Sequence, residues 1–110
     1  MKFTSTIKKN YEFKRLYNKG KSSASQYVAV YCRRNGTDFS RLGITVSAKI
    51  GGAVVRNRIR RRLKEIYRLN EEKLKPGLDI VIAARKKCVF AGYHEIENSV
   101  LAVLRKLSLI

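Results

Sequence analysis

The segment VRNRIRRRLKEIYR, residues 55–68, limits what this chain can fold into more than any other. It carries seven cationic side chains and one acid, while Val55, Ile59, Leu63 and Ile66 recur at helical spacing. This period predicts a helix over residues 53–70, whose apolar stripe must be buried against other elements. The cations share the outer face, where each like-charge pair four residues apart costs about 0.2–0.5 kcal/mol. The helix therefore needs a core on one side and favours an anion on the other.

The remaining elements fit around this helix. Residues 10–18 predict a helix with Phe13, Leu16 and Tyr17 on one face and Gly20 at its end. Three strands are predicted in QYVAVYCR, RLGITVS and LDIVIAAR, beginning at residues 26, 41 and 78, and a last amphipathic helix spans about residues 93–107. KSSAS, residues 21–25, reads as a polar loop, and the Asn35-Gly36 turn predicts that the first two strands form an antiparallel pair. We expect a single α+β domain over residues 1–110, an α-β-β-α-β-α sandwich with one central sheet and packed helices.

The overall charge indicates the class of partner. Lys and Arg number 25 against 8 Asp and Glu, a formal net charge of +17. Such an excess attracts polyanions, and nucleic acid is a commoner polyanionic partner than an anionic membrane surface. The N-terminus has no apolar signal region, and the apolar run at residues 80–84 is too short to span a bilayer. Cys32 and Cys88 are expected to be buried free thiols, so we expect a cytoplasmic protein.

The start of the basic helix is short of negative charge. Arg56 and Arg58 fall in its first turns, and Gly51-Gly52 precedes it where a capping side chain would normally stand. Backbone phosphates would supply that charge. A merely solvated face is the alternative, but Glu65 is the only acid among these cations. Arg62 falls close to the apolar stripe, so either it extends past the core edge or the helix is rotated from this register.

No set of residues in the sequence suggests catalysis by the protein itself. His94 is the only histidine and has no nucleophile beside it in sequence, and the acids show no metal-ligand spacing. We therefore expect no catalytic and no metal-binding residues, with any chemistry residing in a partner. Aromatic residues on the first helix and first strand, Phe13, Tyr17, Tyr27 and Tyr31, are either ordinary core or a surface for unpaired nucleotides.

Residues 47–61, SAKIGGAVVRNRIRR, closely resemble the RNR signature of the bacterial ribonuclease P protein subunit. The resemblance extends to KKNYEF at residues 8–13, to Gly20, and to Ala83-Ala84-Arg85. It implies the ribosomal protein S5 domain 2-like fold, with a left-handed βαβ crossover. That hand is family knowledge, since the usual rule predicts the opposite.

The resemblance also implies a function. In this family a catalytic RNA with bound Mg²⁺ removes the 5′ leader of precursor tRNA, and the protein is the accessory subunit of that endoribonuclease. Phe13, Tyr17 and Tyr31 match the cleft that holds the leader. Together, the resemblance and the charge pattern make the expected RNA-binding residues Lys49, Arg56, Asn57, Arg58, Arg60, Arg61, Lys64 and Arg68.

The sequence departs from the family at two positions. Tyr17 stands where Phe is common, and Ala48 stands where many members have a second Lys. Two other classes compete with this interpretation. One is a small basic RNA-binding protein of the ribosome, and the other is a nucleoid protein that coats DNA.

Overall fold

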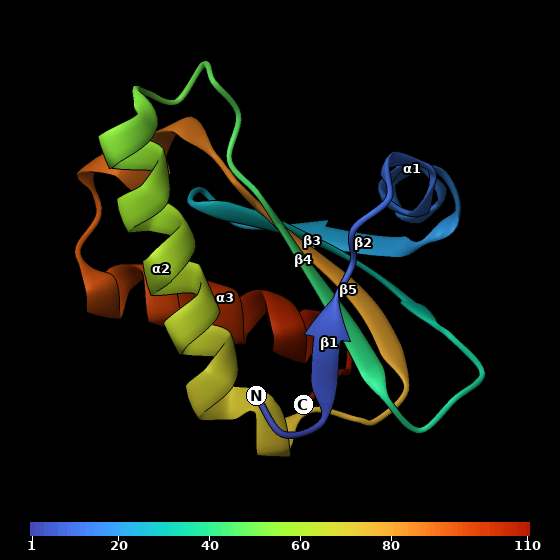
Figure 1. The fold of residues 1–110 in the computed structure, drawn as a ribbon. Helices are drawn as coiled ribbons and strands as arrows, with labels where there is room; N and C mark the ends of the chain where they lie inside the picture. Colours follow the sequence, from blue (N-terminus) through green and yellow to red (C-terminus); the bar gives the residue numbers. More distant parts are fainter.

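The computed structural model describes all residues from Met1 to Ile110. Three helices, one mixed sheet of five strands and two short 3₁₀ helices make up the fold (Figure 1). The helices are α1 (Asn10–Lys19), α2 (Ala53–Asn70) and α3 (Tyr93–Lys106), with η1 (Glu71–Lys73) and η2 (Lys86–Phe90). The strands are β1 (Thr4–Thr6), β2 (Lys21–Ala24), β3 (Val28–Arg34), β4 (Ser40–Thr45) and β5 (Leu78–Ala84). The α+β class, the single domain and the predicted order of the main elements are confirmed.

The strand order β1-β4-β5-β3-β2 shows that the predicted pairing of β3 with β4 is wrong. The Asn35-Gly36 turn exists, with Gly36 at φ +76°, but β5 lies between the two strands it connects. β5 runs antiparallel to β3 and parallel to β4. Its side chains explain this place, because Ile80 and Ile82 are buried on one face and Val81 on the other. A strand that is apolar on both faces is stable only at the centre of a covered sheet.

Two edge strands complete the sheet. β1 runs parallel to β4, and β2 pairs antiparallel with β3, Lys21 opposite Cys32. The segment predicted as a polar loop is therefore largely a strand. Its Ser-rich sequence has no apolar alternation, so the backbone hydrogen bonds with β3 define it as a strand.

The parallel neighbours β4 and β5 are connected through α2, which makes a βαβ crossover unit. The bounds of α2 match the predicted residues 53–70, and α1, β5 and α3 fall where the sequence predicts them. The left-handed sense of the crossover stays a prediction.

Helices cover both faces of the sheet (Figure 1). On one face α2 and α3 form the main core with Val28, Val30 and Cys32 of β3. On the other face α1 places Leu16 against Val81 and Ile7, with Phe13 and Tyr31 packed at the margin. As predicted, Cys32 and Cys88 are both buried free thiols. None of the helices is long and apolar enough to cross a membrane.

Candidate nucleic-acid interface

α2 divides into a buried stripe and a cationic outer face. Ile59, Leu63 and Ile66 are almost completely buried in the main core, which fixes the rotation of the helix. On the outer side Asn57, Arg60, Arg61, Lys64 and Arg68 are exposed. Arg56 and Arg58 are half-buried near the start of the helix, and Lys49 is exposed in the preceding loop. These eight residues, Lys49 included, are called the α2 surface below.

Arg56 and Arg58 differ from the other cations because part of each guanidinium is buried. Their Nε atoms are shielded from solvent and have no hydrogen-bond acceptor. A buried donor without an acceptor costs roughly 1–3 kcal/mol. A phosphate matches the fork geometry of a guanidinium, and it would remove that cost once the side chain turns its Nε toward solvent.

The N-terminus of α2 is open, as predicted. Its N-cap is Gly52, no side chain caps it, and the first turn contains no acid. The first N–H groups of a helix carry partial positive charge and lack partners within the helix. Together with Arg56 and Arg58 they make this end of α2 the part of the surface best suited to an anion.

Three cations of α2 already have hydrogen-bond acceptors, and Arg60 has the longest bond, from Nη1 to Asn57 Oδ1 at 3.5 Å. Arg68 donates from Nη2 to Glu65 Oε1 at 2.6 Å and from Nε to Oε2 at 3.0 Å. This hydrogen bond holds the pKa of Glu65 below its ordinary value. Arg62 donates from Nη1 to the carbonyl of Ala91 at 3.4 Å. Of the two predicted alternatives for Arg62, the structure therefore has the side chain that extends past the core edge, where it binds the backbone after η2.

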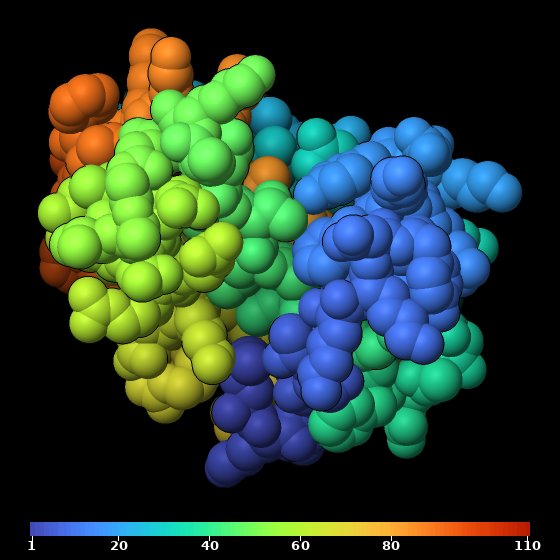
Figure 2. All heavy atoms as spheres, turned by 45° about the horizontal axis from the view of Figure 1, so that its top comes forward, coloured from blue at the N-terminus to red at the C-terminus, as the bar shows by residue number.

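The three predicted leader residues lie together between α1 and the sheet; they are called the aromatic cluster below. The rings of Tyr17 and Tyr31 meet edge to face, with centroids 4.8 Å apart and planes at 80°. Tyr17 is 41% exposed, whereas Phe13 and Tyr31 are half-buried. Tyr27 lies apart from them, half-buried against the main core, and donates its hydroxyl to Glu95. Figure 2 shows a hollow between α1, in blue, and α2, in green, with parts of the sheet at its base.

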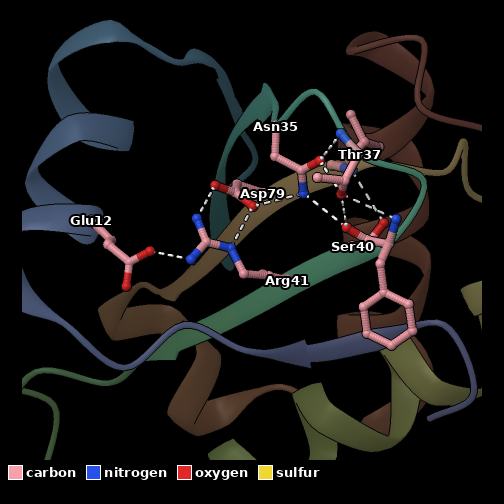
Figure 3. Close-up of polar contacts among 8 residues, drawn as sticks. Glu12, Asn35, Thr37, Ser40, Arg41 and Asp79 are labelled. Atoms are coloured by element: carbon pink, nitrogen blue, oxygen red, sulfur yellow. Dashed lines mark hydrogen bonds and ion pairs between the residues drawn. The ribbon is translucent and has the colours of Figure 1, made fainter.

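A polar network that the sequence interpretation missed fixes α1 on the sheet (Figure 3). Arg41 of β4 donates from Nε and Nη2 to the two carboxylate oxygens of Asp79, at 3.0 and 2.6 Å. Its third nitrogen, Nη1, donates to Glu12 of α1. Asn35 adds a bond from Nδ2 to Asp79 Oδ1 at 3.1 Å. Only the alternation of Arg41 with Leu42 in β4 hinted that its side chain points toward α1.

The network shifts the ionisation of its members. Burial by itself would raise the pKa of Asp79, but the hydrogen bonds from Arg41 and Asn35 outweigh it and lower that pKa. The hydrogen bond to Asp79 is in turn the main reason that the pKa of Arg41 is raised. Arg41 and Asp79 are therefore both charged at neutral pH, and α1 is tied to β4 and β5 beside the aromatic cluster.

The remaining titratable candidates are His94 and the other acids. No group of three or more His, Cys, Asp or Glu side chains could hold a metal ion. His94 is 90% exposed and lies 3.8 Å from Glu97 on the same helix. What the surface offers is charge and aromatic rings for binding.

A small α+β domain with this charge excess and this α2 surface defines a basic nucleic-acid-binding protein. Comparisons with known proteins specify the class further. The sequence model of one family, described as Ribonuclease P, matches residues 1–108. The ribonuclease P protein component of Alkaliphilus oremlandii is 46% identical over 110 residues, which cover 100% of this chain and 96% of that protein.

Solved structures of ribonuclease P proteins share this fold. The Staphylococcus aureus RNase P protein superposes with a TM-score of 0.87 at 37% identity, covering 94% of this chain and 95% of that one. The Thermotoga maritima RNase P protein gives a TM-score of 0.84 at 33% identity, covering 93% and 96%. The chain belongs to the ribonuclease P protein family, and its role is that of the protein component of this RNA-containing endoribonuclease. Family membership removes the ribosomal and DNA-coating alternatives.

Proposed function

We propose that this protein binds the catalytic RNA of ribonuclease P through the α2 surface and holds the 5′ leader of precursor tRNA against the aromatic cluster. The RNA subunit then contains the catalytic centre and holds Mg²⁺. The observation that carries the proposal is the pair Arg56 and Arg58, whose buried Nε donors have no acceptor. Once these side chains turn toward solvent, phosphate oxygens of an RNA backbone would satisfy both donors.

Each part of the α2 surface has a distinct task in this proposal. The open N-terminus of α2 and the guanidinium groups of the two half-buried arginines bind phosphates at the start of the helix. Arg60, Arg61 and Lys64 are exposed and add long-range attraction and further phosphate contacts. Lys49 extends the surface into the loop before the helix. Arg68 contributes least, since Glu65 already neutralises it.

The aromatic cluster suits unpaired nucleotides. A base can stack on the exposed ring of Tyr17, which the ring of Tyr31 meets edge to face. The hydroxyl of Tyr17, where Phe is common in the family, adds a donor beside the ring. Stacking is tolerant of sequence, which suits leaders that differ among precursor tRNAs.

Mg²⁺ is best assigned to the RNA subunit. The protein offers no cluster of carboxylates for the ion, and Glu12, Glu65, Asp79 and Glu95 are engaged in ion pairs or a helix cap. When bound, Mg²⁺ would supply activation of water and stabilisation of the leaving oxygen. The buried free thiols support a place in the reducing cytoplasm.

The deciding experiment adds the purified protein to a ribonuclease P RNA at low Mg²⁺ and follows cleavage of a precursor tRNA. We expect 5′ leader removal only when both subunits are present. Protein with Mg²⁺ but without RNA should cleave nothing. Site-specific cleavage by the RNA-free protein would overturn the assignment of the catalytic centre.

A further inference from the structure

A second basic surface lies away from α2. A cavity of about 680 Å³ opens where β2 and β3 meet the loop before β5 and the end of α3. The cations that line it are Lys19, Lys21, Arg33, Arg34 and Lys75, and no carboxylate lines it. We call it the β3 recess. None of these cations takes part in an ion pair: the acidic partners of the ion pairs are Glu12, Glu65, Asp79 and Glu97.

The β3 recess and the start of α2 lie at opposite ends of the sheet. Arg33 and Arg34 pair with Asp79 and Leu78, the first residues of β5. α2 instead follows the far end of β4, which runs parallel to β5. At about 3.3 Å per residue, the length of β5 separates the two ends by about 20 Å. In Figure 1 the start of α2 lies at the top and the C-terminus, close to the recess, at the bottom.

Backbone hydrogen bonds and a close backbone contact fix the walls of the recess. Gly77, at φ +71°, approaches the loop after β3 so closely that a Cβ there would lie 2.0 Å from the carbonyl oxygen of Thr37. Asn35 N donates to Gly77 O at 3.0 Å, and Asn35 Oδ1 accepts from Thr37 N at 2.9 Å. On the opposite wall Lys75 N donates to Leu109 O at 3.0 Å. Because these bonds hold the backbone, a ligand would meet a preformed shape.

The floor of the recess is apolar beneath its cationic rim. Leu78, Leu107 and Leu109 line it, with Cys32 at its base. Ser108 N and Leu109 N already bond carbonyl oxygens of the last turn of α3, which weakens the negative end of that helix beside the recess. An apolar floor with a ring of cations suits a nucleotide whose base or ribose rests inside while its phosphates lie along the rim.

We infer that the β3 recess is a second RNA-binding site, which takes the phosphate backbone of RNA at the end of the sheet opposite to α2. This inference rests on the proposed function, because RNA is the partner that the family supplies. One protein would then contact two separate stretches of RNA backbone about 20 Å apart. The RNA stretch is part of either the catalytic RNA or the precursor tRNA, since both present the same phosphates.

The neighbouring surface directs RNA toward the rim. A smaller cavity of about 320 Å³ next to it is lined by Asp38, Glu71 and Glu72, whose negative charges disfavour phosphate there. Lys75 borders both cavities, so Arg33 and Arg34 give the cleaner test.

The test compares two double variants of the whole protein, Arg33→Gln/Arg34→Gln in the recess and Arg56→Gln/Arg58→Gln on α2. Affinity is measured against KCl concentration, first for the catalytic RNA and then for precursor tRNA binding to the assembled complex. Each lost phosphate contact flattens the log–log slope by about 0.7–0.9. We expect the recess variant to flatten one of the two slopes by about 1.5, and the slope that changes identifies the RNA.

Two control variants separate the effect of charge from the effect of position. Arg33→Lys/Arg34→Lys keeps both charges and should retain most of the slope. Lys2→Gln/Lys73→Gln removes two exposed charges that line neither surface and should leave both slopes almost unchanged. Circular dichroism confirms that each variant is folded.

The outcomes separate the two proposals. If the α2 variant flattens the slope for catalytic RNA and the recess variant changes neither slope, the recess proposal is wrong while the α2 proposal stands. If neither variant has an effect, the proposed function is wrong as well. Binding of each variant to phosphatidylglycerol vesicles is measured as well. If the recess variant loses vesicle binding while its RNA slopes stay unchanged, the recess is a membrane contact and the inference is wrong.

Discussion

The ring of Phe13 occupies the space that a side chain at position 43 would need. A Cβ on Gly43 would lie 2.5 Å from Cε1 and 2.7 Å from Cζ of Phe13. Gly43 is in β4 and opposite Val81 of β5, so the ring rests directly on the sheet. The position of α1, and with it the aromatic cluster, thus depends on a missing side chain in β4.

Gly43→Ala should therefore displace Phe13 and destabilise the protein. Overpacking of this kind costs typically about 1–3 kcal/mol. Urea unfolding of the wild type and the variant measures the loss. In the Phe13→Leu background the same substitution should cost less, because the smaller side chain can move aside. An equal cost in both backgrounds would show that the strain arises elsewhere.

Asp79→Asn should lower the unfolding free energy at neutral pH by about 1–3 kcal/mol, since a hydrogen-bonded ion pair with Arg41 is weakened. The effect depends on pH with a definite sign. Because the folded pKa of Asp79 is lowered, its stabilisation is fully present above the ordinary value of 3.8 and is lost as pH falls through the folded pKa. The wild type and variant should therefore converge in stability as pH falls below that folded pKa.

Chemical unfolding at pH 7 and at several lower values checks this sign. The difference between the two proteins isolates Asp79 from Glu71 and Glu65, whose pKa values are also lowered. A difference that grows as pH falls would contradict the assignment of the ion pair. Arg41→Lys should lower the unfolding free energy by a smaller amount, because Lys cannot bond both Asp79 and Glu12 in the same geometry.

Arg56→Ala and Arg58→Ala should weaken assembly with the catalytic RNA without unfolding the protein. Each removes a buried donor that has no acceptor and a like-charge pair on the helix, so stability should hold or rise slightly. Filter binding at several KCl concentrations and thermal melts measure both effects.

Arg68→Ala is the matched control for these two variants. Its guanidinium is held by Glu65, so RNA affinity should fall less than for Arg56→Ala. A clear drop in melting temperature for Arg56→Ala or Arg58→Ala would make those residues structural instead.

The parts of the fold that follow from local periodicity could be predicted from the sequence. α2 begins and ends where the apolar spacing of Val55, Ile59, Leu63 and Ile66 indicates, because burial of one stripe fixes a helix. The strand order could not be predicted in this way. Strand pairing depends on contacts between residues far apart in sequence, and the Asn35-Gly36 turn alone favoured the wrong neighbour.

In the candidate site, too, the sequence predicts what is local and misses what long-range contacts bring together. The cations of the α2 surface lie close together in sequence and were recognised from it. Glu12, Arg41 and Asp79 are far apart in sequence and meet only in the folded protein. The β3 recess likewise joins residues near positions 20, 33, 75 and 108, so no local sequence motif predicts it.

The length of the leader should decide how much the aromatic cluster contributes to substrate binding. Tyr17 is the exposed member of the cluster, whereas Phe13 also packs on Gly43. Tyr17→Ala should therefore reduce leader binding with little cost in stability, while Phe13→Ala should reduce both. A stacked base is worth roughly 1–3 kcal/mol, so the holoenzyme carrying Tyr17→Ala should bind a precursor with several leader nucleotides about 5- to 150-fold more weakly.

A precursor with a single leader nucleotide should barely respond to Tyr17→Ala, because it does not reach the aromatic cluster. Tyr17→Phe keeps the ring and should retain most of the affinity, which separates stacking from the hydroxyl group. Tyr31→Ala removes the ring that meets Tyr17 edge to face and should show the same dependence on leader length, more weakly. The measurement is the affinity of both substrates for each holoenzyme, with circular dichroism as the folding control. Equal losses for long and short leaders would show that these rings only support the fold, and the leader would then have to bind elsewhere on the protein.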